Sequence, residues 1–138
     1  MEPAGKESAD FKTTLADYME NGLLDNIIDM FKHDQSLYAY IGGLITDERM
    51  RVRIGATALV ESLRKEDPEN IGRAIPHLLP LLKAEAPVIR GDAAYLLGVI
   101  GNKEVVPFLN ELIDDADMNV RMITREAIDD IAEDSQSA

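Results

Sequence analysis

A nine-residue pattern occurs three times in this chain, and it constrains the fold more than any other sequence feature. The three copies align without gaps and are Val52–Val60, Ile89–Leu97 and Val120–Ile128. In each copy an Arg follows the first apolar residue, and a small residue stands three positions later. The arginines are 37 and 31 residues apart, a period typical of arrays of helix pairs.

Apolar residues at helical spacing also precede each copy of the pattern. The matching triplets are Ile41/Leu44/Ile45, Leu78/Leu81/Leu82 and Leu109/Leu112/Ile113. Each repeat is therefore predicted to be two helices joined by a short turn. In the second helix of the first repeat, the buried stripe is predicted to consist of Val52, Ala56, Leu59, Val60 and Leu63. One such pair cannot bury its apolar stripe alone, and stacked pairs form a continuous core. The sequence predicts an all-α fold, an α-solenoid of about four antiparallel helix pairs.

The same periodicity divides the chain. We expect a flexible lead over residues 1–9, a single repeat domain over 10–132 and an acidic tail over 133–138. Within the domain, residues 10–33 form a diverged N-terminal capping pair, and the repeats span 36–66, 68–101 and 103–132. The inner stripe of the capping pair is predicted to include Phe11, Leu15, Tyr18, Met19, Leu23, Leu24, Ile27, Ile28 and Phe31. Pro76 and Pro80 predict a kink, or a helix start nearer Ala74, because an interior proline removes a helical hydrogen bond.

The repeated Arg is interpreted as a link within the array rather than as a phosphate-binding residue. Asp47 and Asp115 stand six residues before Arg53 and Arg121, which suggests an Asp–Arg bridge across each turn. The equivalent position before Arg90 is Ala84, so this series of Asp–Arg bridges is expected to be interrupted there.

The pair Gly42-Gly43 is costly inside a helix, and it indicates close approach of a neighbouring helix or a bend.

These residues resemble HEAT repeats, in particular the short form of phycobilin-lyase-like HEAT proteins. Ile89-Arg90, Ala93-Ala94, Leu96-Leu97-Gly98 and Ile100-Gly101 follow that form closely over the middle repeat. The resemblance covers about residues 36–132 and implies a curved right-handed superhelix that binds another protein on its concave face. The outward positions of the second helices would then form the binding surface. The candidate residues are Ile54, Ala58, Val88, Asp92, Tyr95, Val99, Met122 and Glu126.

Charge and composition limit the classes of partner that the chain could bind. The chain has 26 Asp and Glu against 14 Lys and Arg, a net charge of −12, which argues against nucleic acid or an anionic membrane as partner. The charge suits either an ordinary acidic surface or a basic protein partner. The absence of Cys and of an apolar leader predicts a cytoplasmic protein.

No catalytic, cofactor-binding or metal-binding constellation stands out in the sequence. The series Asp115, Asp117, Asn119 and Glu126 has the spacing of a calcium loop, but Val120 occupies the place of its glycine and the repeat predicts a helix there. His33 and His77 have no partner at ligand spacing, and the His-Glu pairs of HEAT-type di-iron hydroxylases are missing.

We therefore expect a small protein-interaction module, a scaffold, adaptor or regulatory subunit, that is not an enzyme and exists as a monomer or weak homo-oligomer. The alternative, implied only by the family resemblance, is a bilin lyase-like enzyme or enzyme subunit that acts on a tetrapyrrole. A third hypothesis is a homo-oligomer formed through an exposed end of the array, where Met118, Met122 and Ile123 stand.

Overall fold

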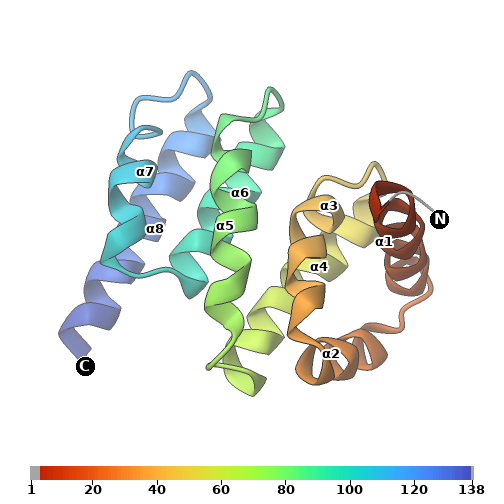
Figure 1. Cartoon of the computed structure of the whole chain (residues 1–138). Helices are drawn as coiled ribbons and strands as arrows, with labels where there is room; N and C mark the ends of the chain where they lie inside the picture. Colours follow the sequence, from red (N-terminus) through yellow and green to blue (C-terminus); the bar gives the residue numbers. More distant parts are fainter. Residues whose placement is uncertain (1–3, 138) are drawn as a thin grey trace.

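The computed structural model describes the backbone of residues 4–137 and the side chains of residues 10–134. It is an all-helical α-solenoid, and no strand occurs in that part of the chain. Figure 1 shows two layers of helices, with the first helix of each repeat in front of the second. Residues 1–3 of the expected lead and residue 138 of the expected tail lie outside the described residues.

Two helices stand before the first repeat. Helix α1 (Ala4–Glu20) begins six residues before the expected start at Asp10. It is followed by a turn in which Gly22 adopts a φ of 79°, a left-handed conformation typical of helix ends. Helix α2 (Leu24–His33) lies crosswise to α1 at the end of the array (Figure 1). The expected inner stripe is correct at Leu15 and Met19 but wrong at Tyr18 and Leu23, which are 39% and 40% exposed.

The three repeats follow the predicted helix pairs. The first contains η1 (Gln35–Tyr40), α3 (Ile41–Ile45) and α4 (Met50–Glu66). The second contains η2 (Ile71–Ala74), α5 (Ile75–Leu78), η3 (Leu79–Lys83) and α6 (Pro87–Ile100). The third contains η4 (Lys103–Val105), α7 (Val106–Asn110) and α8 (Met118–Ser137). Helix α8 continues past the expected end near Ala132, because no breaking residue interrupts it.

The first helices are not regular α-helices. Each combines short 3-10 and α-helical turns, and in the second repeat Pro76 and Pro80 stand at the start of α5 and η3. Because a proline cannot donate a helical hydrogen bond, the backbone changes its winding at these two residues. The prediction of an irregularity at the prolines is confirmed.

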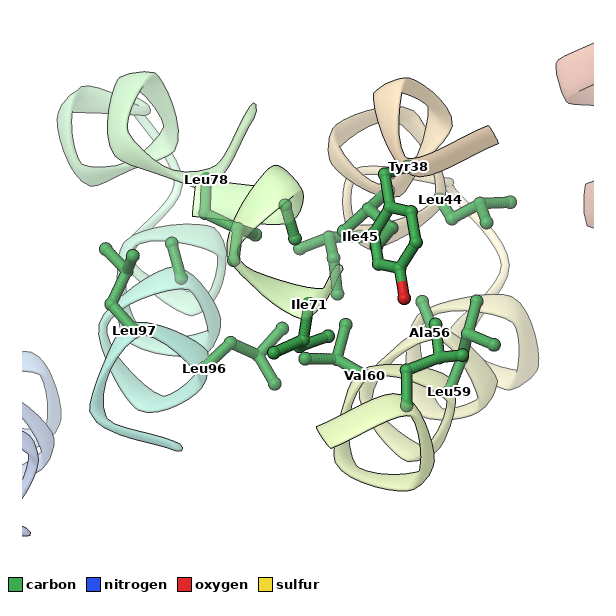
Figure 2. Packing of buried hydrophobic residues seen from close by; sticks show 14 of the residues in the cluster. Tyr38, Leu44, Ile45, Ala56, Leu59, Val60, Ile71, Leu78, Leu96 and Leu97 are labelled. Atoms are coloured by element: carbon green, nitrogen blue, oxygen red, sulfur yellow. The ribbon is translucent and has the colours of Figure 1, made fainter. Parts of the chain in front are cut away.

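One core runs through the whole array. The predicted stripe of α4, which consists of Val52, Ala56, Leu59, Val60 and Leu63, is fully buried. Figure 2 shows Val60, Ile71 and Leu96 pointing toward one another, so that side chains of the first and second repeats share one apolar contact. Burial of this continuous surface stabilises pairs that would not be stable alone.

Close backbone approach between repeats depends on glycine at two positions. A Cβ atom at Gly42 of α3 would lie 2.9 Å from the carbonyl oxygen of His77, so the expectation of a close neighbour at this glycine is confirmed. A Cβ atom at Gly98 of α6 would lie 2.7 Å from Cα and Cβ of Ala127 in α8. The second helices α6 and α8 are therefore in contact through their backbones.

We predict that Gly98→Ala destabilises the fold by about 1–3 kcal/mol, because the added methyl group must push α6 and α8 apart. The measurement is the free energy of unfolding from urea titration followed by circular dichroism. Gly72→Ala is the matched control, since a Cβ atom there meets no atom within 4 Å, and its effect is expected to stay within about 0.5 kcal/mol. Equal effects of the two substitutions would contradict the close contact.

Candidate interaction face

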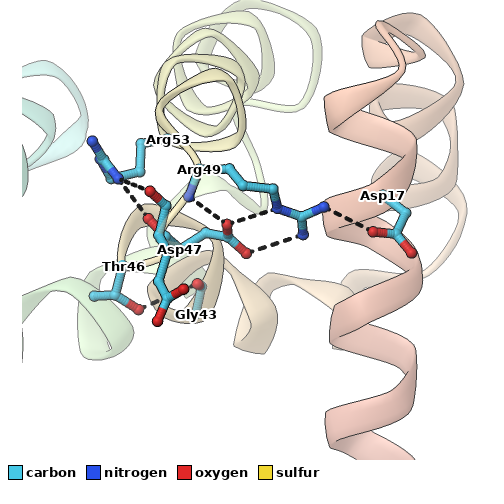
Figure 3. Close-up of polar contacts among 7 residues, drawn as sticks. Asp17, Gly43, Thr46, Asp47, Arg49 and Arg53 are labelled. Atoms are coloured by element: carbon cyan, nitrogen blue, oxygen red, sulfur yellow. Dashed lines mark hydrogen bonds and ion pairs between the residues drawn. The ribbon is translucent and has the colours of Figure 1, made fainter.

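Each second helix carries in its first turn an arginine that binds the turn before the helix. Arg53 Nη1 donates to the carbonyl oxygens of Asp47 and Glu48 at 2.7 and 3.0 Å (Figure 3). Arg90 donates in the same way to Ala84 and Glu85 at 2.8 and 2.9 Å. Arg121 donates to Asp115 and Ala116 at 2.7 and 3.3 Å. The expected break at Ala84 is wrong, because the acceptor is a backbone carbonyl, which every residue has.

The aspartate side chains of these turns bind other groups. Asp47 accepts hydrogen bonds from the backbone N–H and the guanidinium of Arg49, which also reaches Asp17 of α1 at 2.9 Å (Figure 3). The bond from the Arg49 guanidinium is the main reason that the pKa of Asp47 is lowered. These contacts attach the N-terminal pair to the first repeat.

Asp115 joins the second repeat to the third. Its two carboxylate oxygens accept bonds from Nε and Nη2 of Arg90, both at 2.9 Å, and a third bond comes from the backbone N–H of Asp117. The Arg90 side chain is 15% exposed and that of Asp115 is 9% exposed. The guanidinium, and then the N–H of Asp117, lower the pKa of Asp115. Asp115 is thus engaged in a structural bridge, and Asn119 and Glu126 lie within α8, which contradicts a calcium loop.

Two hollows lie between the outward sides of the second helices. The first, of about 410 Å³, lies between α4 and α6, and the second, of about 460 Å³, lies between α6 and α8. Both are lined by Val88 and Asp92, so they adjoin along α6. We call the surface of the two hollows, together with Tyr95, the second-helix face.

Five of the eight predicted partner-binding residues line the hollows: Ile54, Ala58, Val88, Asp92 and Met122. Val99 and Glu126 lie outside both hollows. Tyr95 stands beside the first hollow, where its hydroxyl donates to Glu61 of α4 at 2.7 Å. That bond is the largest cause of a raised Tyr95 pKa.

Met50 lines the first hollow and is 66% exposed, although it was not among the residues predicted from the sequence. Met50 stands three residues before the repeated Arg, as Pro87 and Met118 do, and this equivalence in the repeat could have indicated it. The exposed fractions of Ile54, Val88 and Met122 are 63%, 56% and 53%. Four exposed apolar side chains thus gather on one face, which is typical of an interaction surface.

Asp92 is the unusual polar residue of this face. It is half-buried, and it makes no hydrogen bond or ion pair with any side chain that the structure describes. Burial raises its pKa, and the nearby charge of Arg53 offsets only part of that effect. A carboxylate held in this way destabilises the folded chain unless another group solvates it.

Among the described residues no group of three or more His, Cys, Asp and Glu side chains is arranged to hold a metal ion. In the same part of the chain, no helix has both the length and the apolar character that are needed to cross a membrane.

Comparison with known proteins supports the repeat assignment. Residues 75–138 match the family model of HEAT repeats, a range that begins at α5 within the second repeat and includes the third repeat. No curated protein matches the chain significantly. The match concerns HEAT repeats in general, and the phycobilin-lyase-like subtype stays a prediction.

We predict that Asp115→Asn lowers the melting temperature at neutral pH by roughly 5 °C, because it removes the charge paired with Arg90. A carboxyl group with a lowered pKa contributes stability above its unfolded value of about 4 and loses it as the pH falls through the folded value. The difference between the two proteins should therefore shrink below about pH 4. Asp114→Asn, an exposed neighbour, is the control, and an equal loss there would contradict the bridge.

The opposite sign is expected for Asp92. Its raised pKa means that the folded chain binds the proton more tightly, so its stability is greatest in acid and is lost as the pH rises through the folded value. Asp92→Asn should raise the melting temperature by a few degrees at pH 7, and the gain should vanish below about pH 4. Thermal melts across this pH range give the measurement, and a loss of stability at pH 7 would contradict the assignment.

Proposed function

We propose that this chain is a protein-interaction module, a scaffold, adaptor or regulatory subunit with no chemistry of its own, and that it binds its partner on the second-helix face. The observation that carries the proposal is the position of Met50, Ile54, Val88 and Met122 on one face of three stacked helices. HEAT repeats are commonly protein-interaction modules, and the family match to residues 75–138 supports the same assignment.

The geometry also favours a rigid site. The helices that carry this face are fixed at their starts by the three arginines, and Arg64 of α4 reaches Asp134 of α8 at 3.3 Å past the end of α6. A preformed surface loses little conformational entropy when a partner binds, so modest apolar contacts suffice for affinity.

Affinity capture with matched variants tests the proposal. The full chain, tagged at one end, is used to capture proteins from a lysate of the cells that express it naturally, and bound proteins are quantified by mass spectrometry. We expect one stoichiometric partner, and we expect the double variant Ile54→Asp/Met122→Asp to retain at least tenfold less of it, because two charges would enter the hollows.

Phe108→Asp serves as the matched control. Phe108 is 45% exposed but lies on α7, in the layer of first helices. This variant should capture the partner as the unchanged chain does. Capture of the same partner by the Ile54→Asp/Met122→Asp variant would place the binding surface elsewhere on the molecule.

A further inference from the structure

Carboxylates predominate among the charged side chains of the second-helix face. Glu61, Asp92 and Asp117 line the hollows, and Arg53 is the one cation among the described residues that line them. Asp130 lies close enough to Tyr95 to raise the pKa of that side chain, so a further negative charge borders the face. The local potential therefore favours a positively charged occupant.

Arg53, the cation that lines the first hollow, does not form an ion pair with Asp92. Its guanidinium donates to the carbonyl oxygens of Asp47 and Glu48 instead. Glu61 accepts the Tyr95 hydroxyl, and Asp117 accepts the N–H of Val120 at 3.0 Å. Of these three carboxylates, Asp92 alone accepts no hydrogen bond from the described residues.

The position of Asp92 adds a geometric constraint. It lies on the wall that the two hollows share, beside Val88, with Ile54 in one hollow and Met122 in the other. A ligand that fits would place apolar groups on both sides of a single cation. An amphipathic helix offers such groups, because side chains three or four residues apart lie on one face.

We propose that the second-helix face binds a basic amphipathic segment of a partner protein, whose Lys or Arg pairs with Asp92 while apolar side chains on either side enter the two hollows. The proposal rests on the interaction function given above and specifies its partner. Formation of the pair would supply the hydrogen bonds that the half-buried carboxylate lacks, and it would thereby recover the cost of its burial.

Charge also argues against a second copy of the chain as the occupant. Two such faces would bring the same carboxylates together, in a protein whose net charge is −12. Like charges in an interface oppose association, and the same argument applies to nucleic acids and anionic membranes.

Selection from a displayed library of random linear peptides, with the immobilised full chain as target, tests this proposal. We expect the recovered peptides to carry apolar residues at helical spacing with Lys or Arg between them. Titration calorimetry on synthetic copies should show binding that Asp92→Asn weakens about tenfold and that added salt also weakens. Asp29→Asn on α2, which removes the same charge far from the face, is the matched control.

The outcomes separate this inference from the proposed function. Peptides that lose affinity with Ile54→Asp but not with Asp92→Asn, or that carry no basic residue, would overturn the basic partner and retain the face. Peptides that bind both variants unchanged would overturn both proposals, as would recovery of no binder. Self-association of the chain in sedimentation experiments, abolished by Ile54→Asp, would show that a second copy is the occupant.

Discussion

The structure depends on how the turn inside each helix pair is held. In every repeat an arginine at the start of the second helix donates to two backbone carbonyls of the preceding turn. These charge-assisted bonds satisfy carbonyl oxygens of the turn itself, which lies outside both helices. Ile54 and Met122 directly follow their arginines and are exposed, whereas the equivalent residue of α6, Gly91, is buried and lines the hollow between α6 and α8.

The two junctions between repeats are not equivalent. Asp115 forms an ion pair with Arg90 across the junction of the second and third repeats, and α6 and α8 are in close contact at Gly98 and Ala127. At the junction of the first and second repeats the corresponding loop residue is Ala84, so Arg53 receives no carboxylate from that loop. Tyr95 and Glu61 provide the polar link there instead. Asp92 of α6 lines the hollows at both junctions, and it is half-buried without a hydrogen-bond partner among the described residues.

This arrangement suggests a balance between stability and binding. A half-buried carboxylate and four exposed apolar side chains each cost the free chain stability or solubility. Both features occur on the same face. Such a distribution is typical of a surface kept for recognition, because groups that are unfavourable alone become favourable when a partner covers them.

The repeat, the helix pairs and most of the core could be predicted from the sequence alone. Periodicity is a local property, and it correctly predicted the buried stripe of α4 and the irregularity at Pro76 and Pro80. It was wrong at Tyr18 and Leu23, because burial at the end of an array depends on which neighbours happen to cover it. It named five residues that line the hollows and missed Met50. The polar partners depended on the tertiary structure. Arg53 and Arg121 bind backbone carbonyls rather than the aspartate side chains that the spacing suggested, whereas Arg90 binds the Asp115 side chain of another repeat. Asp92 accepts no hydrogen bond from the described residues. Such choices follow from distances between segments far apart in the chain, which no local pattern encodes.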